Sequence, residues 1–226
     1  MCLDFHSIAG MKKNVCILSS AYLPPIQYMS KLLLYDEVII DAMEHYRKQS
    51  YRNRCQLYGA NGILPLTVPL MHLNSENTAV RDMKIANDFD WQKVHWRSLE
   101  SAYRCSPFFE YYEDYFMEFY SVEQQSLLHF NNSLLHKVCD LLRIKPNITH
   151  ALEYVADYGE GADDFRNTIH FKEKFAKVDA DFHPVRYIQV FENKHGFKPN
   201  LSILDLMFCE GPHALEILKS SCGKGE

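Results

Sequence analysis

Basic and tyrosine side chains are interleaved in residues 45–62, HYRKQSYRNRCQLYGANG. Arg47, Lys48, Arg52 and Arg54 fall within eight residues of a chain whose formal net charge is -5. Arg and Lys suit phosphates and carboxylates, and a tyrosine ring suits a sugar face or a base. The stretch therefore indicates either a site for an anionic ligand or a solvated edge strand whose charges prevent aggregation.

Two residues are candidates for proton transfer. Asp41 ends the apolar segment EVIID, where it could act as a general base or an orienting carboxylate, or cap a turn. His95 lies in an amphipathic segment, where it could act as an acid or base, or be a hydrogen-bonded core histidine. The pattern DADFH at 179–183 has alternating carboxylates, but nothing near it completes a ligand set. We therefore predict no metal site, and the sequence identifies no cofactor.

These residues require an α/β fold to position them. Residues 14–19 and 38–42 predict two buried strands, and 26–35 predict the helix between them. This order predicts a β-α-β unit with parallel strands and a right-handed crossover. Residues 51–70 predict a hairpin that joins these strands in a mixed sheet, and 81–86 predict a further short strand.

The middle of the chain, about residues 90–145, is predicted to be helical. Asp90 and Ser106 are expected to start the first two helices, and Ser121 the third through a Ser-x-x-Gln capping box. The last third predicts mixed α/β structure, in which Asp163, Asp164 and Arg166 form an exposed charged turn.

We expect a single domain over residues 11–226, with residues 1–10 as a disordered extension. Hydrophobic residues make up 47% and charged residues 23% of the chain, which is typical of a globular protein. No apolar run approaches the ~18 residues of a membrane span. Seven cysteines at wide spacing, without a C-x-x-C pair, disfavour a disulfide framework or a zinc ribbon and favour a cytoplasmic protein. The negative net charge argues against general nucleic-acid binding.

Ligands of open parallel sheets bind beyond the carboxyl ends of the strands. The two predicted strands end at Ser19-Ser20 and at Asp41, a few residues before the basic stretch. Side chains from both ends and from the hairpin are therefore expected to converge on one cleft. They are Ser20, Tyr22, Gln27, Asp41, Lys48, Asn53 and Arg54.

Four segments, in this order, resemble the WbqC-like family: YLPPIQYMSKL, KQSYRNRCQLYGANGILPLTVPL, HWRSLESAYRCSPFF and LSILDLMFCEGP. The resemblance covers about Asn14 to Leu218. It implies a bacterial protein associated with surface polysaccharide or O-antigen gene clusters, and a transferase that attaches an amino acid such as glycine to a sugar. Matching positions include Tyr22, Asn53, Arg54, His95 and Tyr103, and Tyr103 joins the predicted substrate-binding set. Many members have His-Gln-Pro where this chain has Leu18-Ser19-Ser20.

Two functions follow as hypotheses. The first is a transferase that binds an anionic small molecule, an activated sugar or acyl donor, with Lys48 and Arg54 on its charged part. Tyr22 would stack on the donor, and Asp41 or His95 would carry the proton. The second is a non-catalytic binding or scaffold protein of the same pathway, whose contact or homodimer surface is the aromatic segment 107–120.

Overall fold

The computed structural model describes residues 14–71 and 78–223. The predicted extension at 1–10 lies outside these residues. The chain starts with β1 (Val15–Ser19), α1 (Ile26–Leu34) and β2 (Glu37–Asp41). β1 and β2 pair in parallel, with Ser19 opposite Asp41. The predicted β-α-β unit and the α/β class are confirmed.

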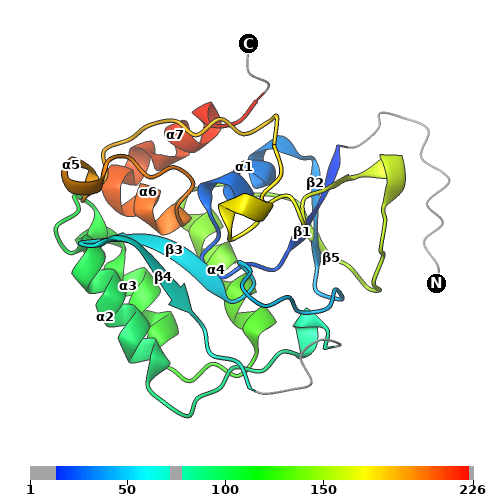
Figure 1. Cartoon of the computed structure of the whole chain (residues 1–226), viewed down its shortest axis with the longest axis horizontal. Helices are drawn as coiled ribbons and strands as arrows, with labels where there is room; N and C mark the ends of the chain where they lie inside the picture. The colour runs from blue at the N-terminus through cyan, green and yellow to red at the C-terminus, as the bar shows by residue number, and fades with distance from the viewer. Residues whose placement is uncertain (1–13, 72–77, 224–226) are drawn as a thin grey trace.

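Two short strands complete the parallel sheet. β5 (Ile148–His150) adds beside β2, and β6 (Asp163–Asp164) adds beside β1, which gives the order β5-β2-β1-β6. All three pairings are parallel. The carboxyl ends of all four strands therefore share one edge, which we call the carboxyl edge (Figure 1).

The hairpin does not join this sheet, contrary to the prediction of a mixed sheet. β3 (Arg54–Gly59) and β4 (Gly62–Thr67) pair only with each other, in an antiparallel two-stranded sheet. Gly62 closes the turn at a φ of 104°, which favours glycine. The reason lies in packing: the buried side of β3 lies against helices, where Tyr58 N–H donates to the Tyr103 hydroxyl at 2.9 Å.

The predicted strand at 81–86 is also wrong. Residues 80–82 form the 3₁₀ turn η2 (Val80–Asp82), and the next residues make only isolated bridges, Leu70 with Ile85 and Lys84 with Ser126. The partners of these bridges lie in different segments, so no ladder can extend.

The helical middle is confirmed as α2 (Trp91–Tyr103), α3 (Phe109–Tyr120) and α4 (Leu127–Leu141). The predicted start of the third helix at Ser121 is wrong. The Ser121 hydroxyl instead donates to the Met117 carbonyl, in the last turn of α3. Ser126 is the residue that caps α4, accepting from His129 N–H.

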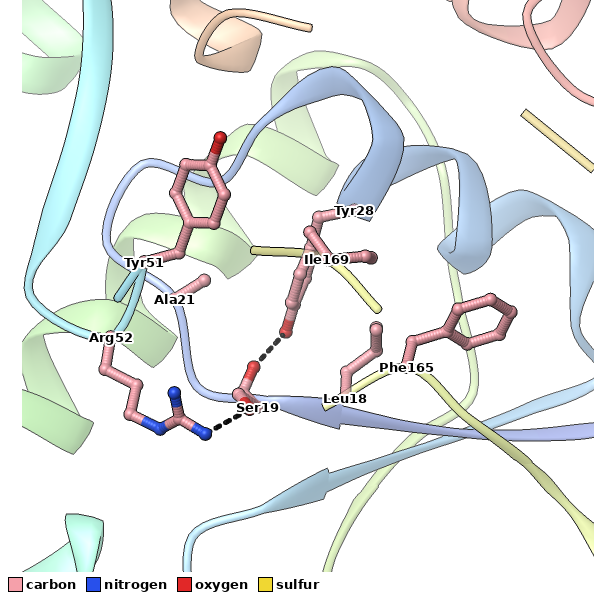
Figure 2. Close-up of a pocket in the computed structure, with 8 residues that line it drawn as sticks. All are labelled: Leu18, Ser19, Ala21, Tyr28, Tyr51, Arg52, Phe165 and Ile169. Carbon is pink, nitrogen blue, oxygen red and sulfur yellow. Dashed lines mark hydrogen bonds between the residues drawn. The ribbon is translucent and has the colours of Figure 1, made fainter. Parts of the chain in front are cut away.

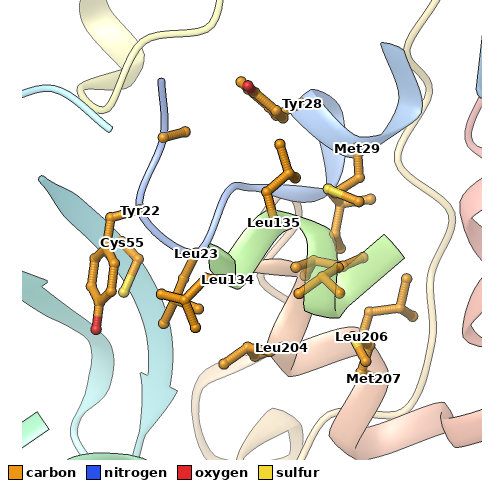
Figure 3. Close-up of a cluster of buried hydrophobic side chains, with 14 of the residues drawn as sticks. Tyr22, Leu23, Tyr28, Met29, Cys55, Leu134, Leu135, Leu204, Leu206 and Met207 are labelled. Atoms are coloured by element: carbon orange, nitrogen blue, oxygen red, sulfur yellow. The ribbon is translucent and has the colours of Figure 1, made fainter. Parts of the chain in front are cut away.

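The chain ends with α5 (Glu192–His195), α6 (Ile203–Glu210) and α7 (Ala214–Ser220), and with the 3₁₀ turns η3 (Gly159–Gly161), η4 (Glu173–Phe175) and η5 (Gly211–His213). Figure 3 shows part of the buried core, in which Leu23 and Leu134 lie near β3 and α4, and Leu204 and Met207 belong to α6. Among the described residues, no helix is both long and apolar enough to cross a membrane.

Candidate functional site

A buried ion pair joins two strands at the carboxyl edge. Arg166 follows β6, and its Nη1 lies 2.6 Å from Oδ2 of Asp41 at the end of β2. Arg166 also donates to both oxygens of Asp164 and to the carbonyls of Val155 and Ala156. These contacts use every N–H of a guanidinium. Arg166 therefore has a structural role in this conformation, because it joins the end of β2 to the segments around residues 155 and 164.

Both carboxylate oxygens of Asp41 also have hydrogen-bond partners. Its Oδ1 accepts from the backbone N–H groups of Met43 and Glu44, at 2.9 and 3.0 Å, while Oδ2 binds Arg166. The carboxylate is fully buried. It orients the turn after β2 and has no face open to a ligand.

A second buried ion pair lies next to the first. Arg52 Nε donates to Glu44 Oε1 at 2.9 Å, and its Nη2 binds Glu44 Oε2 and, at 2.8 Å, Ser19 Oγ. Arg52 and Glu44 are 4% and 5% exposed. The carboxyl end of β1 is thus tied to the basic stretch through Arg52.

Two cavities adjoin this pair. The smaller, of about 20 Å³, is shown in Figure 2 and is lined by Leu18, Ser19, Ala21, Tyr28, Tyr51, Arg52, Phe165 and Ile169. The larger, of about 170 Å³, is lined by Glu44, His45, Arg47, Tyr154, Ala156, Arg166 and Asn167. Because Arg52 lines one cavity and Glu44 the other, the ion pair lies between them.

Positive charge gathers here. Arg47 donates to the amide oxygen of Asn167, a neutral partner. The pKa of His170 is lowered by burial and by the nearby charges of Arg52, Lys172 and Arg47. His170 Nδ1 lies 3.0 Å from the Lys172 N–H and 3.3 Å from the Lys172 carbonyl, so it accepts from the first in one tautomer and donates to the second in the other. The arrangement can hold an anion and offer it N–H donors.

Some predicted residues lie near this edge. Ser20 is buried, and its Oγ accepts from Asn131 Nδ2 at 2.9 Å. Asn53 is buried between Tyr46 and the Val68 carbonyl. The Arg54 guanidinium lies over the Phe171 ring, 5.7 Å from its centroid. Lys48 is exposed.

Tyr22 and His95 lie in the core instead. The Tyr22 hydroxyl is 2.9 Å from His95 Nδ1 and 2.7 Å from the Tyr120 hydroxyl, and Tyr22 is fully buried. Burial lowers the pKa of His95 to about 4. His95 is therefore neutral at pH 7. In this conformation neither side chain is placed to touch a ligand.

Tyr103 is likewise a core residue. Its hydroxyl donates to Asp205 Oδ1 at 2.8 Å, and Tyr187 and Gln189 donate to Oδ2. The Asp205 carboxylate is fully buried, and burial raises its pKa. These three donors, none of which is a cation, satisfy the carboxylate, so this cluster packs α2 and α6 together.

Gln27 binds outside the two cavities. Its Nε2 donates to Asp179 Oδ2 at 2.8 Å, and Lys31 Nζ contacts Asp179 Oδ1 at 2.7 Å. Asp179 is thus the partner of a buried lysine. Within the described parts of the chain, no group of three or more His, Cys, Asp or Glu could hold a metal ion.

Sequence reasoning missed Glu44, His170 and the burial of Arg166, which was expected in an exposed turn. Arg166 is 7% exposed. A weak indication existed for Glu44, since it directly follows the second strand. Nothing near Arg166 in the sequence indicates its pairing with Asp41, which lies 125 positions earlier.

Comparison with known proteins gives one family and one relative. The model of the WbqC-like protein family matches residues 19–217. An uncharacterised protein of Mycobacterium tuberculosis, Rv1507c, is 29% identical over 92% of this chain and 98% of its own length. No solved structure matches.

Proposed function

The chain belongs to the WbqC-like protein family, and we propose that it is a cytoplasmic transferase of bacterial surface-polysaccharide assembly. Its donor, an activated sugar or acyl group with an anionic part, binds at the carboxyl edge of the parallel sheet. One observation carries the proposal: Arg47 lines a cavity of about 170 Å³ next to the buried Arg52–Glu44 pair, in a chain of net charge -5. The family resemblance supports the pathway.

The larger cavity suits a donor with a flat ring. His45 and Tyr154 line it with nearly parallel rings, at an interplanar angle of 4° and a centroid separation of 6.1 Å. Both side chains are exposed. Exposed aromatic faces bind sugars and bases, and a nearby arginine binds phosphate or carboxylate. Arg47, which also lines the cavity, supplies that charge.

We assign proton transfer to His170 instead of to His95 or Asp41. His95 is buried in the aromatic core, and both oxygens of Asp41 are occupied. His170 is half-buried, and burial together with nearby positive charges lowers its pKa, which favours the neutral ring. An N–H donor among cations stabilises negative charge that develops on a leaving group.

The test is a thermal-shift panel of nucleotide sugars, nucleotides, coenzyme A thioesters, amino acids and divalent metals, followed by mass spectrometry of the products. A ligand at ~100 times its dissociation constant adds about 2.7 kcal/mol. At this size the melting temperature should rise by roughly 5–10 °C. A shift with one donor class, together with a transferred group on an acceptor, supports the proposal. No shift with any anionic compound contradicts it.

A non-catalytic binding protein is the second candidate. It is favoured because both carboxylate oxygens of Asp41 are hydrogen-bonded and His95 is buried. The expected contact surface on 107–120 is less favourable, because Tyr112 and Phe116 are buried. A ligand that shifts the melting temperature but is recovered chemically unchanged, with every acceptor tested, would favour this candidate.

A further inference from the structure

The wall of the larger cavity is built by segments that follow three strands of the parallel sheet. Its lining residues fall in 44–47 after β2, in 154–156 after β5 and in 166–167 after β6. Its volume of about 170 Å³ is below the roughly 300–1,000 Å³ of pockets for drug-sized ligands. The cavity therefore has room for one part of a donor, and its polar groups decide which part.

Glu44 gives this cavity a buried hydrogen-bond acceptor. It lines the cavity and is 5% exposed. Arg52 binds it with two nitrogens, Nε on Oε1 and Nη2 on Oε2. An ionised carboxylate offers about four lone-pair sites on its two oxygens. Within 14–71 and 78–223, no other hydrogen bond reaches these oxygens, so Glu44 can accept a hydrogen bond from a ligand in the cavity.

Arg166 lines the same cavity but has no donor left for a ligand. Its N–H groups are used on Asp41, on Asp164 and on the carbonyls of residues 155 and 156. A phosphate or carboxylate beside Glu44 would therefore face a second carboxylate without gaining a hydrogen bond from Arg166. The ligand group at this place must itself be a donor, which means a hydroxyl or an amine.

Donors for an anionic group lie at the exposed rim of the cavity. Arg47 Nη1 donates to the side-chain oxygen of Asn167, and both residues line the cavity and are exposed. None of the hydrogen bonds found in the described part of the chain uses Arg47 Nη2 or Asn167 Nδ2. The cavity thus combines an acceptor at its buried wall with donors at its rim.

We propose that the larger cavity binds a sugar phosphate, and that Glu44 is a specificity-determining residue that accepts a hydrogen bond from a hydroxyl group of the sugar ring. Arg47 Nη2 and Asn167 Nδ2 bind the phosphate at the rim. The exposed rings of His45 and Tyr154 contact the C–H face of the sugar. The inference rests on the proposed function and narrows its donor to an activated sugar.

The composition of the wall supports a sugar over an acyl group. Among the described residues that line the cavity, Ala156 alone is aliphatic. An acyl chain would find little apolar surface there, and a thioester carbonyl has no hydrogen to donate to Glu44. A sugar ring has hydroxyl groups that both donate and accept, so it can use the acceptor at the buried wall and the donors at the rim.

The experiment is titration calorimetry of the full-length protein with inorganic phosphate, with glycine, and with the 1-phosphates of glucose, galactose, mannose and N-acetylglucosamine. We expect at least one sugar 1-phosphate to bind the native protein about tenfold more tightly than inorganic phosphate does. Glu44→Gln replaces one acceptor oxygen by an NH₂ group. This variant should lose that difference, while inorganic phosphate binds to it no more weakly, because Arg47 is intact.

A second pair of variants leaves the Glu44–Arg52 ion pair untouched, in case Glu44→Gln does not fold. Ala156→Leu fills the cavity without changing a charge, and Ala180→Leu adds the same bulk to an exposed alanine outside the cavity. Ala156→Leu should bind the sugar 1-phosphate about tenfold more weakly, or more weakly still. Ala180→Leu should match the native protein.

Each outcome decides the inference. Native affinity for the sugar 1-phosphate in Ala156→Leu or in folded Glu44→Gln overturns it, as do sugar 1-phosphates that bind no more tightly than inorganic phosphate. Binding of glycine in place of every sugar 1-phosphate also overturns it and identifies an amine as the donor to Glu44. If the inference fails while a coenzyme A thioester is bound and its acyl group transferred, the proposed function stands. If the sugar 1-phosphate binds as expected but no group is transferred, the proposed function fails alone.

Discussion

Oδ2 of Asp41 lies 2.6 Å from Nη1 of Arg166, although the two residues are 125 positions apart. The pair joins the end of β2 to the segment after β6 and borders the larger cavity. It makes Asp41 a residue that shapes the carboxyl edge. The nearest side chains that could contact an anionic ligand are Arg47, Arg52 and His170.

Arg166→Ala should lower the free energy of unfolding by about 3–5 kcal/mol, because it leaves Asp41 buried without its cation. Arg104→Ala is the matched control, since Arg104 pairs with Glu100 and Glu113 while its side chain is 46% exposed. The control should cost less than about 1 kcal/mol. Urea denaturation at pH 7 measures both. Equal losses of unfolding free energy in the two variants would show that burial gives the Asp41–Arg166 pair no greater effect on stability than an exposed pair.

The fold could be predicted to the extent that local patterns determine it. Apolar runs and Pro25 located β1, α1 and β2 to within one or two residues. The pairing of the hairpin could not be predicted, because β3 is buried against helices that come later in the chain. Ser121 and Ser126 are both good capping residues, and only the contact of Ser121 with Met117 decides between them.

The convergence of the strand ends with the basic stretch was predictable, and the partners of the side chains there were not. Strand ends and the basic stretch correctly locate Asp41 and Arg52 at one edge. Residue type alone cannot separate a buried His95 from a half-buried His170, since burial depends on long-range packing. Asp41 lies 125 positions from Arg166, and Asn167 lies 120 positions from Arg47, so these two pairings have no local pattern.

His95 should make the protein sensitive to mild acid. Its pKa in the folded state is lowered from 6.5 to about 4 by burial. Its contribution to stability is present above pH 6.5 and is lost as the pH falls toward 4, because the unfolded chain takes up the proton first. The loss is about 3 kcal/mol for this one group. The free energy of unfolding of the native protein minus that of His95→Gln should fall by this amount between pH 7 and pH 4. A constant difference would mean that His95 is not buried as a neutral ring.

Gly211→Ala should destabilise the fold without touching the site. Gly211 has a φ of 52°, and a Cβ there would overlap the ring of Phe108. Strain and overlap together should cost about 2–4 kcal/mol. Gly161→Ala is the control, since a Cβ there meets nothing within 4 Å. Thermal unfolding of both variants measures the difference, and equal melting temperatures would contradict the packing of Phe108 under η5.

Binding of an anion should raise the pKa of His170. Burial and the charges of Arg52, Lys172 and Arg47 now lower this pKa. A bound anion offsets these charges, so we expect the pKa of His170 to rise. Proton NMR titration of the imidazole, with and without a saturating anion, gives the two values. An unchanged pKa would place the anion away from His170.

The most direct test of the central claim is the affinity of the donor found in the thermal-shift panel for Arg47→Ala and Arg104→Ala, measured by titration calorimetry against the native protein. Both substitutions remove one arginine charge, but only Arg47 lines the larger cavity. If the carboxyl edge binds the anionic donor, Arg47→Ala should bind it about tenfold more weakly, or more weakly still, and Arg104→Ala should match the native protein. Native affinity in Arg47→Ala would place the donor elsewhere and contradict the account.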